Sequence, residues 1–136
     1  MKRVAILVLI LSAIGALYGL YLFNKKPSDI RDMKADYEIS SIDLIKEFSV
    51  DEEKATKKYN DKVLLVSGKV SEVNLSSSTV FLYASDTFAS VTCSFYTDEL
   101  PHLQTIKKDD AIQVKGKCTG KLIDVVLNNC RLSLSK

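Results

Sequence analysis

The sequence predicts a mainly β fold with some α-helix: a five-stranded barrel that follows an N-terminal transmembrane helix and a short helical segment. Three observations support this fold class. Residues 4–23 form an uncharged apolar block, residues 41–59 show helical spacing, and apolar and polar residues alternate with a period of two from residue 62 onward. The expected organisation is an anchor over residues 1–26, a linker over 27–40 and a folded domain over 41–136.

The apolar block over residues 4–23 is long enough to cross a bilayer. A helix rises about 1.5 Å per residue, so this segment spans roughly the 30 Å hydrocarbon core. Lys2 and Arg3 precede the block, and no cysteine of a lipoprotein signal follows it. A cleaved signal peptide is the alternative, because residues 13–15 resemble a cleavage site. Its apolar region is normally shorter, about 7–15 residues, and we therefore expect an uncleaved signal anchor.

The orientation of this anchor depends on the charges at its two ends. Lys and Arg are enriched on the cytoplasmic side of membrane helices. The count is nearly balanced or slightly favours a cytoplasmic C-terminus, because four basic residues lie within 25–34. A very short N-terminal tail that carries Lys2 and Arg3 is nevertheless typical of an export signal. We expect a single-pass membrane protein whose C-terminal domain lies on the extracytoplasmic side.

The net charge of the chain changes sign when the anchor is left out. The whole chain carries +2, but residues 27–136 hold 15 Lys and Arg against 17 Asp and Glu, which is −2. Neutralisation of phosphates supplies most non-specific affinity for nucleic acids. A slightly acidic domain therefore disfavours nucleic acid as a partner.

Two helix starts are expected within residues 41–59. Ser40 and Asp43 have the spacing of a helix N-cap and an acid in the first turn. Ser49 and Glu52 have the spacing of a capping box, which predicts a second helix that ends near residue 60. The lead-in to the barrel is therefore expected to be helical.

Five strands and one short helix follow. Gly68 and Gly116 occupy the same inward phase of the first and fourth strands, where a small barrel needs a sharp bend or a close backbone approach. Three strands, a helix and two strands is the order of an OB-type barrel. The expected strands lie at about 62–73, 79–83, 88–95, 111–119 and 125–134, and the helix at 98–103.

These residues resemble a known family. The matching motifs are Ala55-x3-Tyr59, Val66-x-Gly68-x-Val70, Cys93-x-Phe95, Val114-x-Gly116-x-Cys118-x-Gly120 and Asp124-Val125-Val126-Leu127-x-x-Cys130. Together they resemble the bacterial tRNA_anti-like OB-fold family over about residues 41–134. The resemblance implies a membrane-anchored or lipoprotein-type envelope protein, and the family name does not imply tRNA binding. The turn at 108–110 departs from the family, which commonly has a glycine there.

The cysteines Cys93, Cys118 and Cys130 do not have the spacing of a metal site. They form no CxxC pair and have no histidine nearby in sequence, so we expect no metal and no cofactor. In an oxidising compartment two of the three can form a disulfide. Alternatively all three are buried as small apolar residues in alternating strands.

The sequence contains no pattern typical of a catalytic site. His102 is the only histidine and is expected at the surface, and no nucleophile elbow, phosphate loop or dinucleotide fingerprint occurs. We expect no enzymatic activity.

Binding is the remaining class of function, because OB barrels bind ligands on the face of their second and third strands. The candidates are aromatic and basic residues expected on the outside of the barrel. Alternatively the aromatic rings are core and the lysines only solubilise the surface. We expect a non-catalytic envelope module for a protein, glycan or small ligand; the alternative is a single-stranded nucleic-acid-binding domain. The candidate residues are Phe81, Tyr83, Tyr96, Lys69, Lys115 and Lys117.

Overall fold

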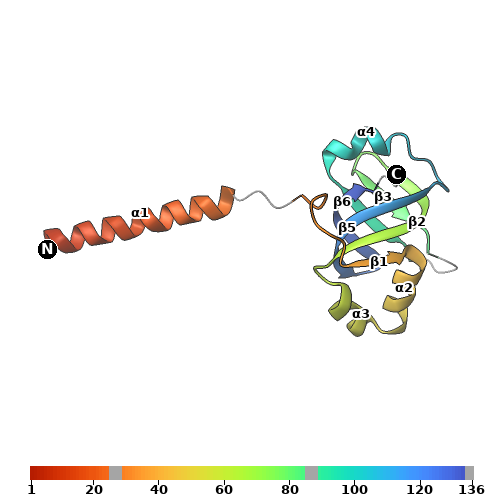
Figure 1. Cartoon of the computed structure of the whole chain (residues 1–136), viewed down its shortest axis with the longest axis horizontal. Coiled ribbons are helices and arrows are strands. Elements are labelled where there is room, and N and C mark those ends of the chain that lie inside the picture. The colour runs from red at the N-terminus through yellow and green to blue at the C-terminus, as the bar shows by residue number, and fades with distance from the viewer. Residues whose placement is uncertain (25–28, 85–88, 134–136) are drawn as a thin grey trace.

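The computed structural model describes residues 1–24, 29–84 and 89–133 (Figure 1). The N-terminal segment is one helix, α1 (Lys2–Asn24), whose described side chains are exposed. Its stretch Ile6–Asn24 is long and apolar enough to cross a membrane by length and composition. The helix predicted for residues 4–23 is therefore present.

Five strands close into a barrel, as predicted. Neighbouring strands follow the order β2-β3-β4-β6-β5, and a pairing between β2 and β5 closes the sheet. Only β4 and β6 run parallel in this ring. The helical elements η1 (Thr97–Glu99) and α4 (Leu100–Leu103) lie between β4 and β5. The strands are β2 (Val63–Asn74), β3 (Thr79–Leu82), β4 (Val91–Phe95), β5 (Ala111–Lys121) and β6 (Val125–Leu132).

The ends of the predicted strands differ from the structure by up to three residues, and the fourth strand, β5, continues to Lys121 instead of 119. The third strand begins at Val91 instead of 88, and residue 88 lies outside the described residues. The fifth ends at Leu132, and residue 134 is also outside them. The register of β2 against β3 shifts between Val70 and Glu72.

A sixth strand lies in the segment that was expected to be only a linker. β1 (Tyr37–Ser40) pairs in parallel with β2, with Tyr37 opposite Leu64. The reason is geometric: β3 is short and pairs with β2 only from Val70 onward, so the first half of β2 offers a free edge. Residues 37–40 fill it. A four-residue strand is too short to show a period, and the sequence therefore did not reveal it.

Helices cover the two ends of the barrel (Figure 1). α2 (Ser41–Val50) and α3 (Glu52–Tyr59) lie at one end, and α4 lies at the other. Ser40 caps α2 as predicted, since its side chain accepts a hydrogen bond from the Asp43 N–H. The cap of α3 is Asp51 and not Ser49, because α2 continues through Ser49 to Val50. Buried apolar residues of both helices, Leu44, Ile45, Phe48, Ala55 and Tyr59, join the core.

The two glycines predicted at bends allow close approaches. A Cβ atom on Gly68 would lie 2.5 Å from Ser41 Oγ, so the absence of a side chain lets the start of α2 pack directly on β2. A Cβ atom on Gly116 would lie 2.6 Å from Cys130 Sγ. Both positions are therefore closed to larger residues.

Candidate functional site

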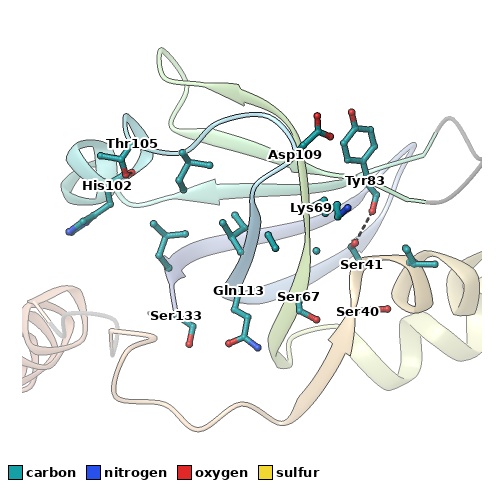
Figure 2. A pocket seen from close by; sticks show the side chains of 16 residues that line it. Ser40, Ser41, Ser67, Lys69, Tyr83, His102, Thr105, Asp109, Gln113 and Ser133 are labelled. Atoms are coloured by element: carbon teal, nitrogen blue, oxygen red, sulfur yellow. Dashed lines mark hydrogen bonds between the residues drawn. The ribbon is translucent and has the colours of Figure 1, made fainter. Parts of the chain in front are cut away.

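A pocket of about 820 Å³ lies between the start of α2, strands β2 and β5, and the connection from α4 to β5 (Figure 2). Ligand pockets in proteins typically measure about 300–1,000 Å³. Ile106, Ile112 and Leu132 are half-buried against the barrel core and form much of its floor. Ile42 and Ala111 add apolar surface at its walls. The pocket is therefore large enough for a ligand, and its floor is apolar.

One hydrogen bond fixes the wall between α2 and β3. Ser41 is buried, and its hydroxyl donates a 2.7 Å hydrogen bond to the Tyr83 carbonyl (Figure 2). This bond depends on the close approach of Ser41 to Gly68. Tyr83 as a residue is 36% exposed. The backbone is thus held in place while the aromatic ring stays accessible.

The polar side chains around the pocket fall into two groups. Some are used by the fold: the Ser40 hydroxyl caps α2, and the Thr105 hydroxyl donates to the His102 carbonyl. Others have neither a side-chain hydrogen bond nor an ion pair within the described residues. These are Ser67, Lys69, Tyr83, Asp109, Gln113 and Ser133. Donors and acceptors without partners around an apolar floor are the features that orient a bound ligand.

Two of the six predicted binding residues come together in this pocket. Lys69 and Tyr83 lie on the same side of it (Figure 2), and the Tyr83 N–H donates to the Lys69 carbonyl at 2.9 Å. Phe81 lies outside the pocket. It is half-buried in β3 between Glu72 and Thr92, in the phase opposite to the buried Val80 and Leu82. Its ring therefore belongs to the outer face of the barrel and not to the core.

The other three predicted residues contact the protein itself. The Arg131 guanidinium stacks over the Tyr96 ring, with its central carbon 4.2 Å from the ring centre. Lys115 donates to the carbonyls of Arg31 and Met33. Lys117 forms a 3.2 Å ion pair with Asp61. These residues therefore do not form a joint platform with Phe81 and Tyr83.

A cluster of charges around Arg131 was not predicted. Its guanidinium is buried and forms ion pairs with Asp29, Asp98 and Glu99. Hydrogen bonds from Arg31 hold the pKa of Asp29 well below its usual range, and Arg131 contributes further. The hydrogen bond from Arg131 also lowers the pKa of Asp98. The partners lie far apart in sequence, so no local pattern indicated this cluster.

The remaining candidates show no reactive arrangement. Cys93, Cys118 and Cys130 are all buried and carry free thiols, and burial raises the pKa of Cys118 and Cys130. His102 is exposed at the surface and lies 3.4 Å from Glu99. Across 1–24, 29–84 and 89–133, His, Cys, Asp and Glu residues form no group of three that could hold a metal ion.

The family model for tRNA_anti-like proteins matches residues 1–132. This chain belongs to the tRNA_anti-like family. Among solved structures, it is similar to a proposed nucleic acid-binding lipoprotein from Klebsiella pneumoniae subsp. pneumoniae MGH 78578. The TM-score is 0.58 and the identity 14%, over 79% of this chain and 99% of the other. At this identity the likeness shows a shared fold. No curated protein matches the sequence with significance.

Proposed function

We propose that this tRNA_anti-like protein is a membrane-tethered, non-catalytic binding module of the cell envelope, whose ligand occupies the pocket between α2, β2, β5 and α4. The observation that carries the proposal is the pocket itself. It combines a half-buried apolar floor with polar groups that have no partner among the residues described. Such groups cost little while they are hydrated and gain hydrogen bonds when a ligand replaces the water.

The membrane tether is supported by the length and composition of α1. The helix is uncharged from Val4 to Phe23, and Tyr18, Tyr21 and Phe23 lie near its end, where aromatic rings favour the membrane interface. Lys2 and Arg3, which precede the uncharged stretch of the helix, favour export of the barrel. A topology reporter fused after Lys136 tests this orientation: an extracytoplasmic signal is expected, and a cytoplasmic signal would contradict it.

Binding is favoured over catalysis by the chemistry of the pocket residues. His102 is the only imidazole of the chain and lies beside Glu99 at the pocket rim. Burial raises the pKa of the Cys118 and Cys130 thiols, and a thiol whose pKa is raised is a poor nucleophile at neutral pH. The pocket is thus better suited to holding a molecule than to transforming it.

Single-stranded nucleic acid is the alternative ligand, because the similar Klebsiella structure is described in those terms. Two observations weigh against it here. Lys115 and Lys117 are engaged by the chain itself, and residues 27–136 carry a net charge of −2. An oligothymidylate titration tests the alternative, since true binding weakens steeply with salt and is lost in Tyr83→Ala.

The pocket is testable by fluorescence because the sequence contains no tryptophan. Ile42→Trp places a reporter at the pocket wall, and Leu122→Trp is a matched control at the exposed β5–β6 turn. Both full-length variants are placed in phosphatidylcholine nanodiscs and titrated with a chito-oligosaccharide, an oligoalanine peptide, short-chain lipids and oligothymidylate. At least one probe other than oligothymidylate is expected to change the emission of Ile42→Trp alone. If no probe does so, the pocket is not a binding site.

A further inference from the structure

The segment after the membrane helix is bound to the barrel along its length. We define this strap as residues 29–40. At its start, Asp29 forms an ion pair with Arg131, and Ile30 is buried with 3% of its surface exposed. Farther along, Asp36 and Val63 exchange hydrogen bonds, and β1 then pairs with β2. The strap is therefore part of the folded domain and does not act as a free linker.

The docked strap limits how far the barrel can be from the membrane. Five residue steps separate Asn24, the last residue of α1, from Asp29. An extended chain spans at most about 3.3–3.6 Å per residue, so these two residues are separated by no more than about 18 Å. The corner of the barrel around Arg131 is consequently held near the end of the helix.

The pocket adjoins this corner. Ser133, at the pocket rim, follows Arg131 by two positions in the chain. His102, which also lines the pocket, lies 3.4 Å from Glu99, and Glu99 in turn lies 3.2 Å from Arg131. Ser133 and His102 therefore connect the lining of the pocket to the corner of the barrel around Arg131. If α1 spans a membrane, the pocket lies within reach of the lipid surface.

The charges of the pocket have opposite signs. Lys69 and Asp109 both line it, both are exposed, and no ion pair joins them in the described structure. Figure 2 shows Lys69, Asp109 and Tyr83 on one side of the pocket, with His102 and Thr105 on the other. A molecule that carries one anion and one cation on a polar head, joined to an apolar part, would match this distribution.

We propose that the pocket binds a zwitterionic phospholipid with a primary ammonium, of the phosphatidylethanolamine class, from the membrane that anchors the chain. Lys69 contacts the phosphate, Asp109 accepts hydrogen bonds from the ammonium, and the floor of Ile106, Ile112 and Leu132 covers the adjoining acyl carbons. This inference rests on the proposed function. A primary ammonium is favoured over choline because only the former has N–H donors for a carboxylate.

Brominated lipids, which quench nearby tryptophan, test this proposal. Full-length Ile42→Trp is placed in phosphatidylcholine nanodiscs that contain a minor fraction of brominated phosphatidylethanolamine, phosphatidylcholine or phosphatidylglycerol. Quenching is expected to be strongest with brominated phosphatidylethanolamine, and Leu122→Trp should show no such preference. Equal quenching by all three lipids would overturn the proposal, because proximity to a bilayer alone gives that result.

Charge variants identify the groups that recognise the lipid head. Asp109→Asn should reduce the preference for phosphatidylethanolamine over phosphatidylcholine by about tenfold, as for loss of a charge-assisted hydrogen bond. Asp109 has a φ of 72°, which asparagine tolerates, so this variant keeps the turn. Lys69→Ala should weaken binding of both zwitterionic lipids, and Lys117→Ala is the matched control. An unchanged preference in Asp109→Asn would contradict the assignment.

Failure of this inference is distinguishable from failure of the proposed function. If the chito-oligosaccharide or the peptide changes the emission of Ile42→Trp and no lipid preference appears, the pocket is a binding site for a different ligand. If no probe and no lipid acts on Ile42→Trp, both proposals fail together.

Discussion

The Arg131 cluster and the pocket lie side by side and use polar residues in opposite ways. Around Arg131, the carboxylates of Asp29, Asp98 and Glu99 all contact the same guanidinium. In the pocket, Lys69 and Asp109 have no charged partner in the described part of the chain. Paired charges hold distant segments of the fold together. Unpaired charges next to an apolar floor remain available to a ligand, and this difference points to the pocket as the functional region.

Of the changes that test this comparison, removal of the Arg131 side chain should reduce the free energy of unfolding most. Arg131→Met removes the buried cation that Asp29, Asp98 and Glu99 share, and Asp29 then keeps only Arg31, a neighbour within the strap. Loss of one partner of a buried ion pair costs about 3–5 kcal/mol. We expect a decrease in the free energy of unfolding of about 3 kcal/mol for the full-length protein in detergent, measured by denaturant titration. A decrease below about 1 kcal/mol would show that the cluster does not hold the strap.

Gly68→Ala should have the next largest effect, because Gly68 lines the pocket and lies directly against Ser41 at the start of α2. Its Cβ atom would overlap with Ser41 Oγ, so the start of α2 must move and the hydrogen bond to Tyr83 is strained. Overpacking of this kind costs about 1–3 kcal/mol. Ser41→Gly in the same chain should restore part of the loss. A double-mutant cycle measures this coupling, and additive effects would contradict the close approach.

Acid should weaken the Arg131 cluster. The pKa values of Asp29 and Asp98 are lower in the folded protein than their ordinary value of 3.8. Groups of this kind stabilise the fold above the pKa of the unfolded chain, and their contribution is lost as the pH falls toward the folded pKa. The free energy of unfolding should therefore decrease below about pH 4. Arg131→Met should show a shallower decrease, because Asp98 loses its main hydrogen bond while Asp29 keeps Arg31. An identical pH profile would show that Arg131 does not contribute to this pH dependence.

The smallest effect on stability is expected in the pocket. Lys69→Ala and Asp109→Asn remove charges that contact no opposite charge among the residues described, so each should change the free energy of unfolding by less than about 0.5 kcal/mol. The same denaturant titration measures this. If either variant is much less stable, its charge serves the fold, and the contrast between the two regions is lost.

The sequence predicted the barrel better than it predicted the site. Alternation with a period of two located the strands, and Gly68 and Gly116 were predicted at close approaches because inward glycines have few other uses. β1 was missed because Tyr37–Ser40 is too short to show a period. The pocket was only partly predicted. Lys69 and Tyr83 were named because they were expected on the outer faces of their strands, whereas Gln113 joins them through the pairing of β2 with β5, opposite Ser67.

If α1 is the proposed membrane anchor, the few residues between Asn24 and Asp29 also affect how tightly the proposed site needs to bind. A module confined to the surface of a membrane meets the components of that surface at a high effective concentration, which reaches millimolar values for short tethers. Binding too weak to be detected in dilute solution would still occupy such a site for much of the time. Release would then be fast, and the module would sample many molecules of the same membrane in succession.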